Sequence, residues 1–107
     1  MRIDITQLEF IDPTLRDMAV WAEKWTGLEF TITSLYRIGD KGVHGDLPLR
    51  GIDLRMRNRL IGDEVQAFIN GKWEYDPERP YKQCALLHGK GHNLHLHLQV
   101  HPNTVRR

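Results

Sequence analysis

The chain contains one cysteine, almost no net charge and no long apolar run. Cys84 has no second cysteine to pair with, so an internal disulfide is excluded. The formal net charge of +1, with scattered basic residues, does not favour nucleic-acid binding. No apolar run approaches the roughly 18 residues of a membrane span, and the opening MRIDITQLEF is not a signal peptide. We therefore expect a soluble protein made in the cytoplasm, with neither nucleic acid nor membrane among its partners.

The length suits a single domain spanning residues 1–107, whose first clear element is a helix. In IDPTLRDMAVWAEKWTG, residues 11–27, Asp12 can cap the start and Gly27 suits the stop. The spacing of the apolar residues predicts one buried face. That face consists of Leu15, Met18, Ala22 and Trp25.

A second helix is predicted in NRLIGDEVQAFING, residues 58–71. Asn70 and Gly71 are typical of a helix end. The apolar residues recur at helical spacing and predict a second buried face. It consists of Leu60 or Ile61, with Val65, Phe68 and Ile69.

Four segments rich in β-branched, aromatic or alternating apolar residues predict strands, and the last two form a terminal hairpin. They are LEFTITSLYR (28–37), GIDLRM (51–56), CALLHG (84–89) and NLHLHLQV (93–100). The glycine-rich segment 38–51 and the proline-containing segment 72–83 are predicted loops. The fold class expected from these elements is α+β, with a small antiparallel sheet and two flanking helices.

The stretch HNLHLHLQVH, residues 92–101, holds four of the six histidines. Alternation along a strand directs His95, His97 and His101 to one face, and the leucines between them to the core. His92 precedes the strand and can fold over that face. An alternating strand needs a polar face in any case, so a histidine pair of this kind is, taken alone, more often ordinary surface than a metal site.

An acid within an apolar strand provides a second clue. Asp53 lies between Ile52 and Leu54, and a buried carboxylate requires a partner. That partner is either an arginine or a metal ion. The arginines available are Arg37, Arg50 and Arg55.

A catalytic zinc ion takes three protein ligands and leaves a fourth position for water. His97 can supply one ligand, and the other two must come from elsewhere in the chain. His44 and Asp53 are candidates, with Asp46 as a rival in a solvated loop. The spacing of these residues does not decide which two of them complete the ligand set.

Three blocks of sequence together resemble the zinc D-Ala-D-Ala carboxypeptidases and murein endopeptidases, which belong to the group that includes lysostaphin and the hedgehog domain. The blocks are TSLYR, GVHGDLPLRGIDLR and HNLHLHL, in this order. The resemblance implies a small antiparallel sheet flanked by helices. It also implies zinc-dependent hydrolysis of amide bonds in peptidoglycan stem peptides or cross-bridges, by a compact enzyme of phage or prophage type.

The resemblance assigns a role to seven residues. It makes His44, Asp53 and His97 the zinc ligands. It makes His95 the general base or a hydrogen-bond donor in the transition state, and His92 a further active-site histidine. It places Arg37 and Ser34 in contact with the substrate.

Two departures from the family pattern accompany these assignments. The family has H-x-x-G-x-A-x-D, whereas the step from His44 to Asp53 here is longer, at nine positions, with Gly51 in the place of the alanine. Many relatives have a glutamate base at the position of Leu94, so an enzyme built on this chain would use imidazole instead.

Two other functions remain open. One is a zinc-containing domain without catalysis that binds cell wall or a protein partner. The other is a phage structural module whose histidines bind no metal. In the absence of a signal peptide, action on the cell wall would need release by a phage lysis system.

The remaining conspicuous side chains are interpreted as structural. Trp21 and Trp25 are expected in the core, and Cys84 is expected to be a small buried residue. Trp73 and Tyr75 either line a cleft or cover the core. His88 and His101 are expected at the surface or satisfied by neighbours.

Overall fold

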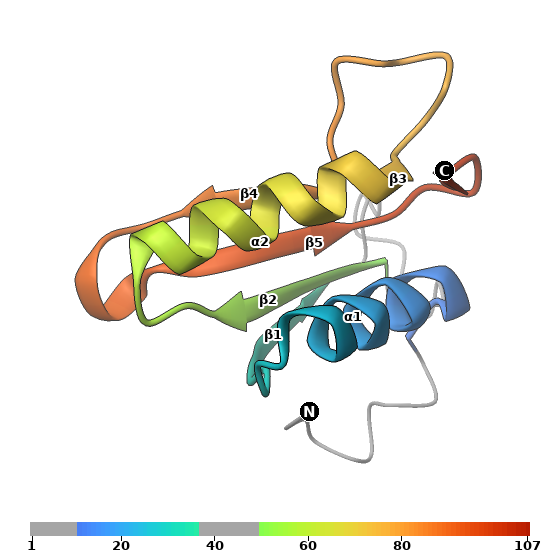
Figure 1. The fold of residues 1–107 in the computed structure, drawn as a ribbon. Helices are drawn as coiled ribbons and strands as arrows, with labels where there is room; N and C mark the ends of the chain where they lie inside the picture. The colour runs from blue at the N-terminus through green and yellow to red at the C-terminus, as the bar shows by residue number, and fades with distance from the viewer. Residues whose placement is uncertain (1–10, 37–49) are drawn as a thin grey trace.

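The computed structural model describes residues 11–36 and 50–107, with residues 34–36 described by their backbone. Two helices and a four-stranded antiparallel sheet account for most of this part of the chain (Figure 1). The larger elements are α1 (Pro13–Thr26), β1 (Ile32–Tyr36), β2 (Gly51–Arg55), α2 (Arg59–Lys72), β4 (Ala85–His88) and β5 (His95–Gln99). The predicted α+β class is therefore confirmed, and the family-specific fold stays a prediction.

Helix α1 begins and ends where the sequence predicts. Oδ1 of Asp12 accepts hydrogen bonds from the backbone N–H of Thr14 (2.8 Å) and Leu15 (3.4 Å). Gly27 ends the helix at φ 71°, a left-handed conformation that glycine adopts without strain. The prediction for Trp25 is wrong, because its side chain is 64% exposed. It lies in a groove between the two helices, and Ala19 completes the buried face instead.

Helix α2 presents a narrower buried face than its sequence predicts. Leu60, Ile61 and Phe68 are exposed, and the residues that are buried are Gly62, Val65 and Ile69. A methyl group built on Gly62 would come within 2.8 Å of Leu87, so the missing side chain lets strand β4 approach the helix.

The end of α2 also differs from the prediction, since the helix continues through Asn70 to Lys72. The side-chain amide of Asn70 contacts the backbone of strand β4. Its Nδ2 donates to the carbonyl of Ala85 and its Oδ1 accepts from the N–H of Ala85, both at 2.9 Å. Asn70 thus fastens α2 to the first residue of β4.

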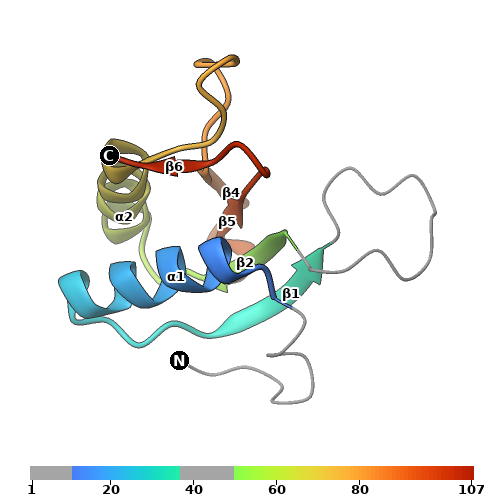
Figure 2. The same ribbon diagram turned by 90° about the vertical axis from the view of Figure 1, so that its right-hand side faces the viewer.

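The sheet has the strand order β1-β2-β5-β4, so the last long strand of the chain lies between two earlier ones. Both helices lie on the same side of this sheet (Figures 1 and 2). The apolar side chains of the central strands face them and are almost fully buried. These are Ile52 and Leu54 on β2, and Leu96 and Leu98 on β5, continued by Leu94 and Val100 beside them.

A second, two-stranded sheet lies within segments whose sequence suggests loop or tail. Strand β3 (Trp73–Glu74) pairs antiparallel with β6 (Val105–Arg106). The segment 72–83 is therefore not a loop throughout, and the β4–β5 hairpin does not end the structure. Trp73 and Tyr75 are both buried and belong to the core. Neither described helix has the length and hydropathy required to cross a membrane.

Candidate functional site

The candidate site lies on the face of the sheet opposite the helices. On β2 and β5 the register places Asp53 directly beside His97, and Arg55 beside His95. Directly paired residues of antiparallel strands point to the same face, as do residues two positions apart on one strand. Because β5 lies between β2 and β4, the register brings residues 44 positions apart in the sequence side by side.

Asp53 is the centre of this arrangement. The residue is 7% exposed, although it lies on the polar face. Its Oδ1 lies 2.9 Å from Nδ1 of His97, and its Oδ2 lies 3.9 Å from Nε2 of His95. An ionised carboxylate only accepts, so the 2.9 Å contact requires either a proton on the imidazole or a cation shared by the two groups. The partners of Asp53 thus include a histidine, whereas the sequence predicts only an arginine or a metal ion.

The ring of His95 is held by a backbone contact at the nitrogen that does not face Asp53. Its Nδ1 lies 2.7 Å from the carbonyl oxygen of Asn93, which can only accept, so Nδ1 carries the proton in this contact. In the neutral ring Nε2 is then the accepting nitrogen, on the side of Asp53. The backbone that precedes β5 therefore selects the neutral tautomer of His95 whose accepting nitrogen is on the side of Asp53.

A third imidazole extends the cluster onto β4. His88 is the register partner of His95, and its ring centroid lies 5.7 Å from that of His95 and 6.5 Å from that of His97. His88 is exposed, as expected, but its place beside the cluster was not foreseen. Its position at the end of the preceding strand, opposite the histidine pair in a hairpin, is the signal that could have revealed it.

A cavity of about 390 Å³ adjoins Asp53 and His95. Thr33, Arg55 and His92 are among the residues that line it. His92 lies in a short 3-10 turn, Gly91–Asn93, so its predicted place before strand β5 is confirmed. The cavity offers a guanidinium and an imidazole next to the buried carboxylate, which suits an anionic or carbonyl-bearing ligand.

The remaining predicted site residues differ in how far the structure describes them. The backbone of Ser34 is the register partner of Asp53 across β1 and β2, so the predicted serine strand borders the site. Arg37, His44 and the rival ligand Asp46 lie outside the described residues, as do residues 38–49 of the predicted loop 38–51. Within residues 11–36 and 50–107, no group of three His, Cys, Asp or Glu side chains is arranged to hold a metal ion.

The pair formed by Asp53 and His97 nevertheless fits part of a zinc site. Zinc binds imidazole nitrogen and carboxylate oxygen, and Zn–N and Zn–O bonds are roughly 2.0–2.2 Å long. Oδ1 and Nδ1, 2.9 Å apart, are close enough for one ion to reach both. The donor types and their separation are therefore suited to the metal that the sequence resemblance implies.

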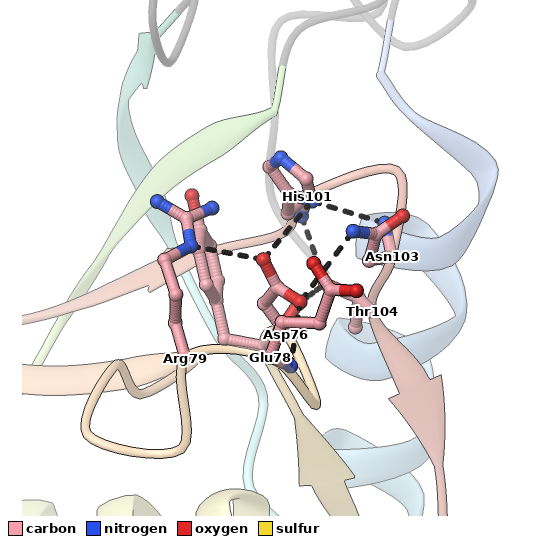
Figure 3. Close-up of polar contacts among 7 residues, drawn as sticks. Asp76, Glu78, Arg79, His101, Asn103 and Thr104 are labelled. Atoms are coloured by element: carbon pink, nitrogen blue, oxygen red, sulfur yellow. Dashed lines mark hydrogen bonds and ion pairs between the residues drawn. The ribbon is translucent and has the colours of Figure 1, made fainter.

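A second polar cluster joins the loop after β3 to the turn before β6 (Figure 3). Asp76 is 3% exposed and accepts hydrogen bonds from Nε of Arg79 (2.9 Å) and from the N–H of Glu78 (3.0 Å). The hydrogen bond from Arg79 holds the pKa of the Asp76 carboxyl below its ordinary value. Nδ1 of His101 accepts from the N–H of Asn103 (3.1 Å). These contacts lie within the loop after β3 or within the turn before β6, and we interpret the cluster as structural.

Cys84 is fully buried immediately before β4, as its sequence context predicts. Burial raises the pKa of its thiol to about 12. At neutral pH the group is a thiol and not the thiolate that nucleophilic catalysis needs. A cysteine-based mechanism is therefore not supported by this residue.

Comparisons of this chain with protein families, with curated proteins and with solved structures find no match.

Proposed function

We propose that this protein is a zinc-dependent metallopeptidase that hydrolyses amide bonds in peptidoglycan stem peptides or cross-bridges. The observation that carries the proposal is the buried carboxylate of Asp53, which lies 2.9 Å from one imidazole and 3.9 Å from another on the neighbouring strand. The metal and the substrate class are those implied by the resemblance of the three sequence blocks. The geometry supports the proposal by bringing two of those blocks together.

In this proposal Asp53 and His97 hold the zinc ion together with His44. A bound zinc ion supplies a Lewis acid and lowers the pKa of the attacking water toward neutrality. His95 acts as general base, and its accepting Nε2 lies on the side of Asp53. The Asn93 carbonyl orients the ring, as the third group of a catalytic constellation does.

The cavity beside Asp53 is the proposed place for the peptide. Arg55 can make a charge-assisted hydrogen bond to a carboxylate or carbonyl of the substrate there, and His92 lines the same space. Arg37 and Ser34 are assigned to substrate contacts by the sequence resemblance. Because peptidoglycan lies outside the cytoplasm, access to it would be provided by a phage lysis system.

Zinc content and peptidase activity, measured on the same preparations, test this proposal. We expect about one zinc per wild-type chain and almost none in Asp53→Ala, because that variant lacks a ligand. His95→Ala should keep its zinc and lose roughly 10²–10⁴-fold in turnover of purified muropeptides, since it lacks the general base. His101→Ala, on the same stretch but outside the site, is the matched control and should keep both.

The outcomes separate the three functions. Zinc with no turnover in the wild type would indicate a non-catalytic zinc domain. An absence of zinc after reconstitution would disprove the peptidase proposal and leave the histidines as the polar face of a strand. Full activity in His95→Ala would show that the base is another residue.

A further inference from the structure

A glutamine at the end of β5 contacts the ring of His97. Gln99 lies two positions beyond His97, on the same face of the strand. Its Oε1 lies 3.3 Å from Nε2 of His97, on the side of the ring away from Asp53. His97 is thus held between a carboxylate at one ring nitrogen and an amide at the other.

The orientation of that amide is fixed by a second contact. Nε2 of Gln99 donates a hydrogen bond of 2.9 Å to the backbone carbonyl of Gln83. A carbonyl oxygen only accepts, so the NH₂ group must point toward Gln83 and the amide oxygen toward His97. The backbone of the segment before β4 therefore determines what Gln99 presents to the imidazole.

An amide oxygen also only accepts, and this limits where the ring of His97 can carry its proton. Its partner, Nε2 of His97, must carry a proton for the contact to be favourable. In a neutral imidazole the proton is then on Nε2, and Nδ1 carries the lone pair. Nδ1 is the atom that lies 2.9 Å from Oδ1 of Asp53, so in this neutral form two electron-pair donors face each other.

We propose that Gln99 is a positioning residue that prepares His97 to bind zinc through Nδ1. The inference rests on the proposed function, because it concerns a ligand of the proposed metal. Histidines that bind metals generally donate their other ring N–H to an acceptor, and that acceptor sets the ring's orientation and basicity. Gln99, oriented by the Gln83 carbonyl, is this acceptor.

Zinc affinity is the direct measure of this role, determined for the full chain with Zn²⁺ and a competing colorimetric chelator. Gln99→Met keeps the side-chain length and removes the acceptor, and it should weaken zinc binding about 10–100-fold. Gln99→Glu keeps an oxygen that accepts from Nε2 and should bind zinc within a few-fold of the wild type.

Gln66→Met is the matched control. Oε1 of Gln66 accepts a hydrogen bond of 2.6 Å from the N–H of Leu87, so this variant also loses a glutamine acceptor, but on helix α2. It should be less stable than the wild type and bind zinc equally well. Equal loss of affinity in Gln99→Met and Gln66→Met would show that stability alone is responsible and would overturn the inference.

A spectroscopic measurement addresses the ring itself. Long-range ¹H–¹⁵N NMR spectra of the zinc-loaded protein should show His97 protonated at Nε2. Protonation at Nδ1 would mean that Nε2 binds the metal and that Asp53 accepts from the ring, which would overturn the assignment.

Failure of this inference and failure of the proposed function are distinguishable. If the wild type binds zinc and Gln99→Met binds it as tightly, the role of Gln99 is disproved and the zinc site stands. If Gln99→Glu loses as much affinity as Gln99→Met, accepting a hydrogen bond from His97 is not the role of this residue. If the wild type binds no zinc, the proposed function falls, and this inference falls with it.

Discussion

Among the described residues two charged side chains are buried, Asp53 and Asp76, and their surroundings differ in kind. Asp76 is matched by the permanent cation of Arg79 and by hydrogen bonds from its own turn. The partners of Asp53 include an imidazole that comes from a distant part of the chain. Imidazole nitrogen and carboxylate oxygen are both donors that zinc can bind, and the proposed function rests on this feature of Asp53.

Asp76 should make the stability of the protein depend on pH. Its carboxyl pKa is below the ordinary value of 3.8 in the folded state, so its ionised form favours folding. This contribution is fully present above pH 3.8 and is lost as the pH falls through the folded pKa. Asp76→Asn should therefore lower the free energy of unfolding near neutral pH, and the deficit should shrink toward strongly acidic pH.

Urea unfolding at several pH values measures this dependence. Glu78→Gln removes the same charge from the same loop and keeps the backbone N–H that Asp76 uses, so it is the control. A deficit of Asp76→Asn that stayed constant from neutral to strongly acidic pH would show that the loss comes from packing and not from the ionised carboxylate.

At the scale of elements, the turn between β4 and β5 contains a glycine in a left-handed conformation next to the carbonyl that holds His95. Gly89 has φ 87°, a conformation that other residues rarely adopt. A methyl group at this position would also collide with the carbonyl of Asn93, the group that holds Nδ1 of His95. The turn that closes the hairpin thus also supports the proposed base.

Gly89→Ala should lower the free energy of unfolding by about 1–3 kcal/mol, because alanine is strained at this φ. It should also reduce turnover, since the Asn93 carbonyl must move. Gly71→Ala is the control: apart from the adjacent residues and the backbone of its own helix, no atom lies within 4 Å of the added methyl group, and it should raise stability by about 0.5–1 kcal/mol. Chemical unfolding curves of both variants test this, and a Gly89→Ala variant as stable as the wild type would contradict it.

The elements that the sequence predicted are those with local signals. Helix α1 has a cap and a stop of its own, and strand β5 alternates leucine with polar residues. Strands β3 and β6 are two residues long each and exist only through their pairing, so neither has a periodic pattern to recognise. The exposed side chain of Phe68 shows the same limit, because helical spacing identifies an apolar face but not how much of it a neighbour covers.

The site was predictable in part for a related reason. The buried acid of β2 and the polar face of β5 each follow from alternation, and the resemblance joined them to one metal. Their actual contact depends on the insertion of β5 between β2 and β4, which is a long-range property of the sheet. Gln99 and His88 were not assigned roles because their partners, the Gln83 carbonyl and the His95 ring, come from the other strand of the hairpin.

At the scale of the whole molecule, zinc should stabilise the fold. A ligand that binds the folded state alone raises the free energy of unfolding, by about 2.7 kcal/mol at a free concentration of 100 times Kd. Because Asp53 and His97 lie on different strands, an unfolded chain does not hold them together. Thermal unfolding should therefore occur at higher temperature with zinc than with a chelator.

Asp53→Ala serves as the control for this comparison, since it should unfold at the same temperature under both conditions. Equal unfolding temperatures for the wild type with zinc and with chelator would mean that no zinc binds to the folded protein.

The origin of the site in distant strands has one further consequence. Asp53 and His97 meet only when β5 has entered the middle of the sheet, so neither the N-terminal nor the C-terminal half of the chain could assemble the pair by itself. The fraction of molecules that hold zinc would then equal the fraction in which β5 is paired with β2. In a refolding experiment, the rate of zinc uptake would report the rate at which this strand pairing forms.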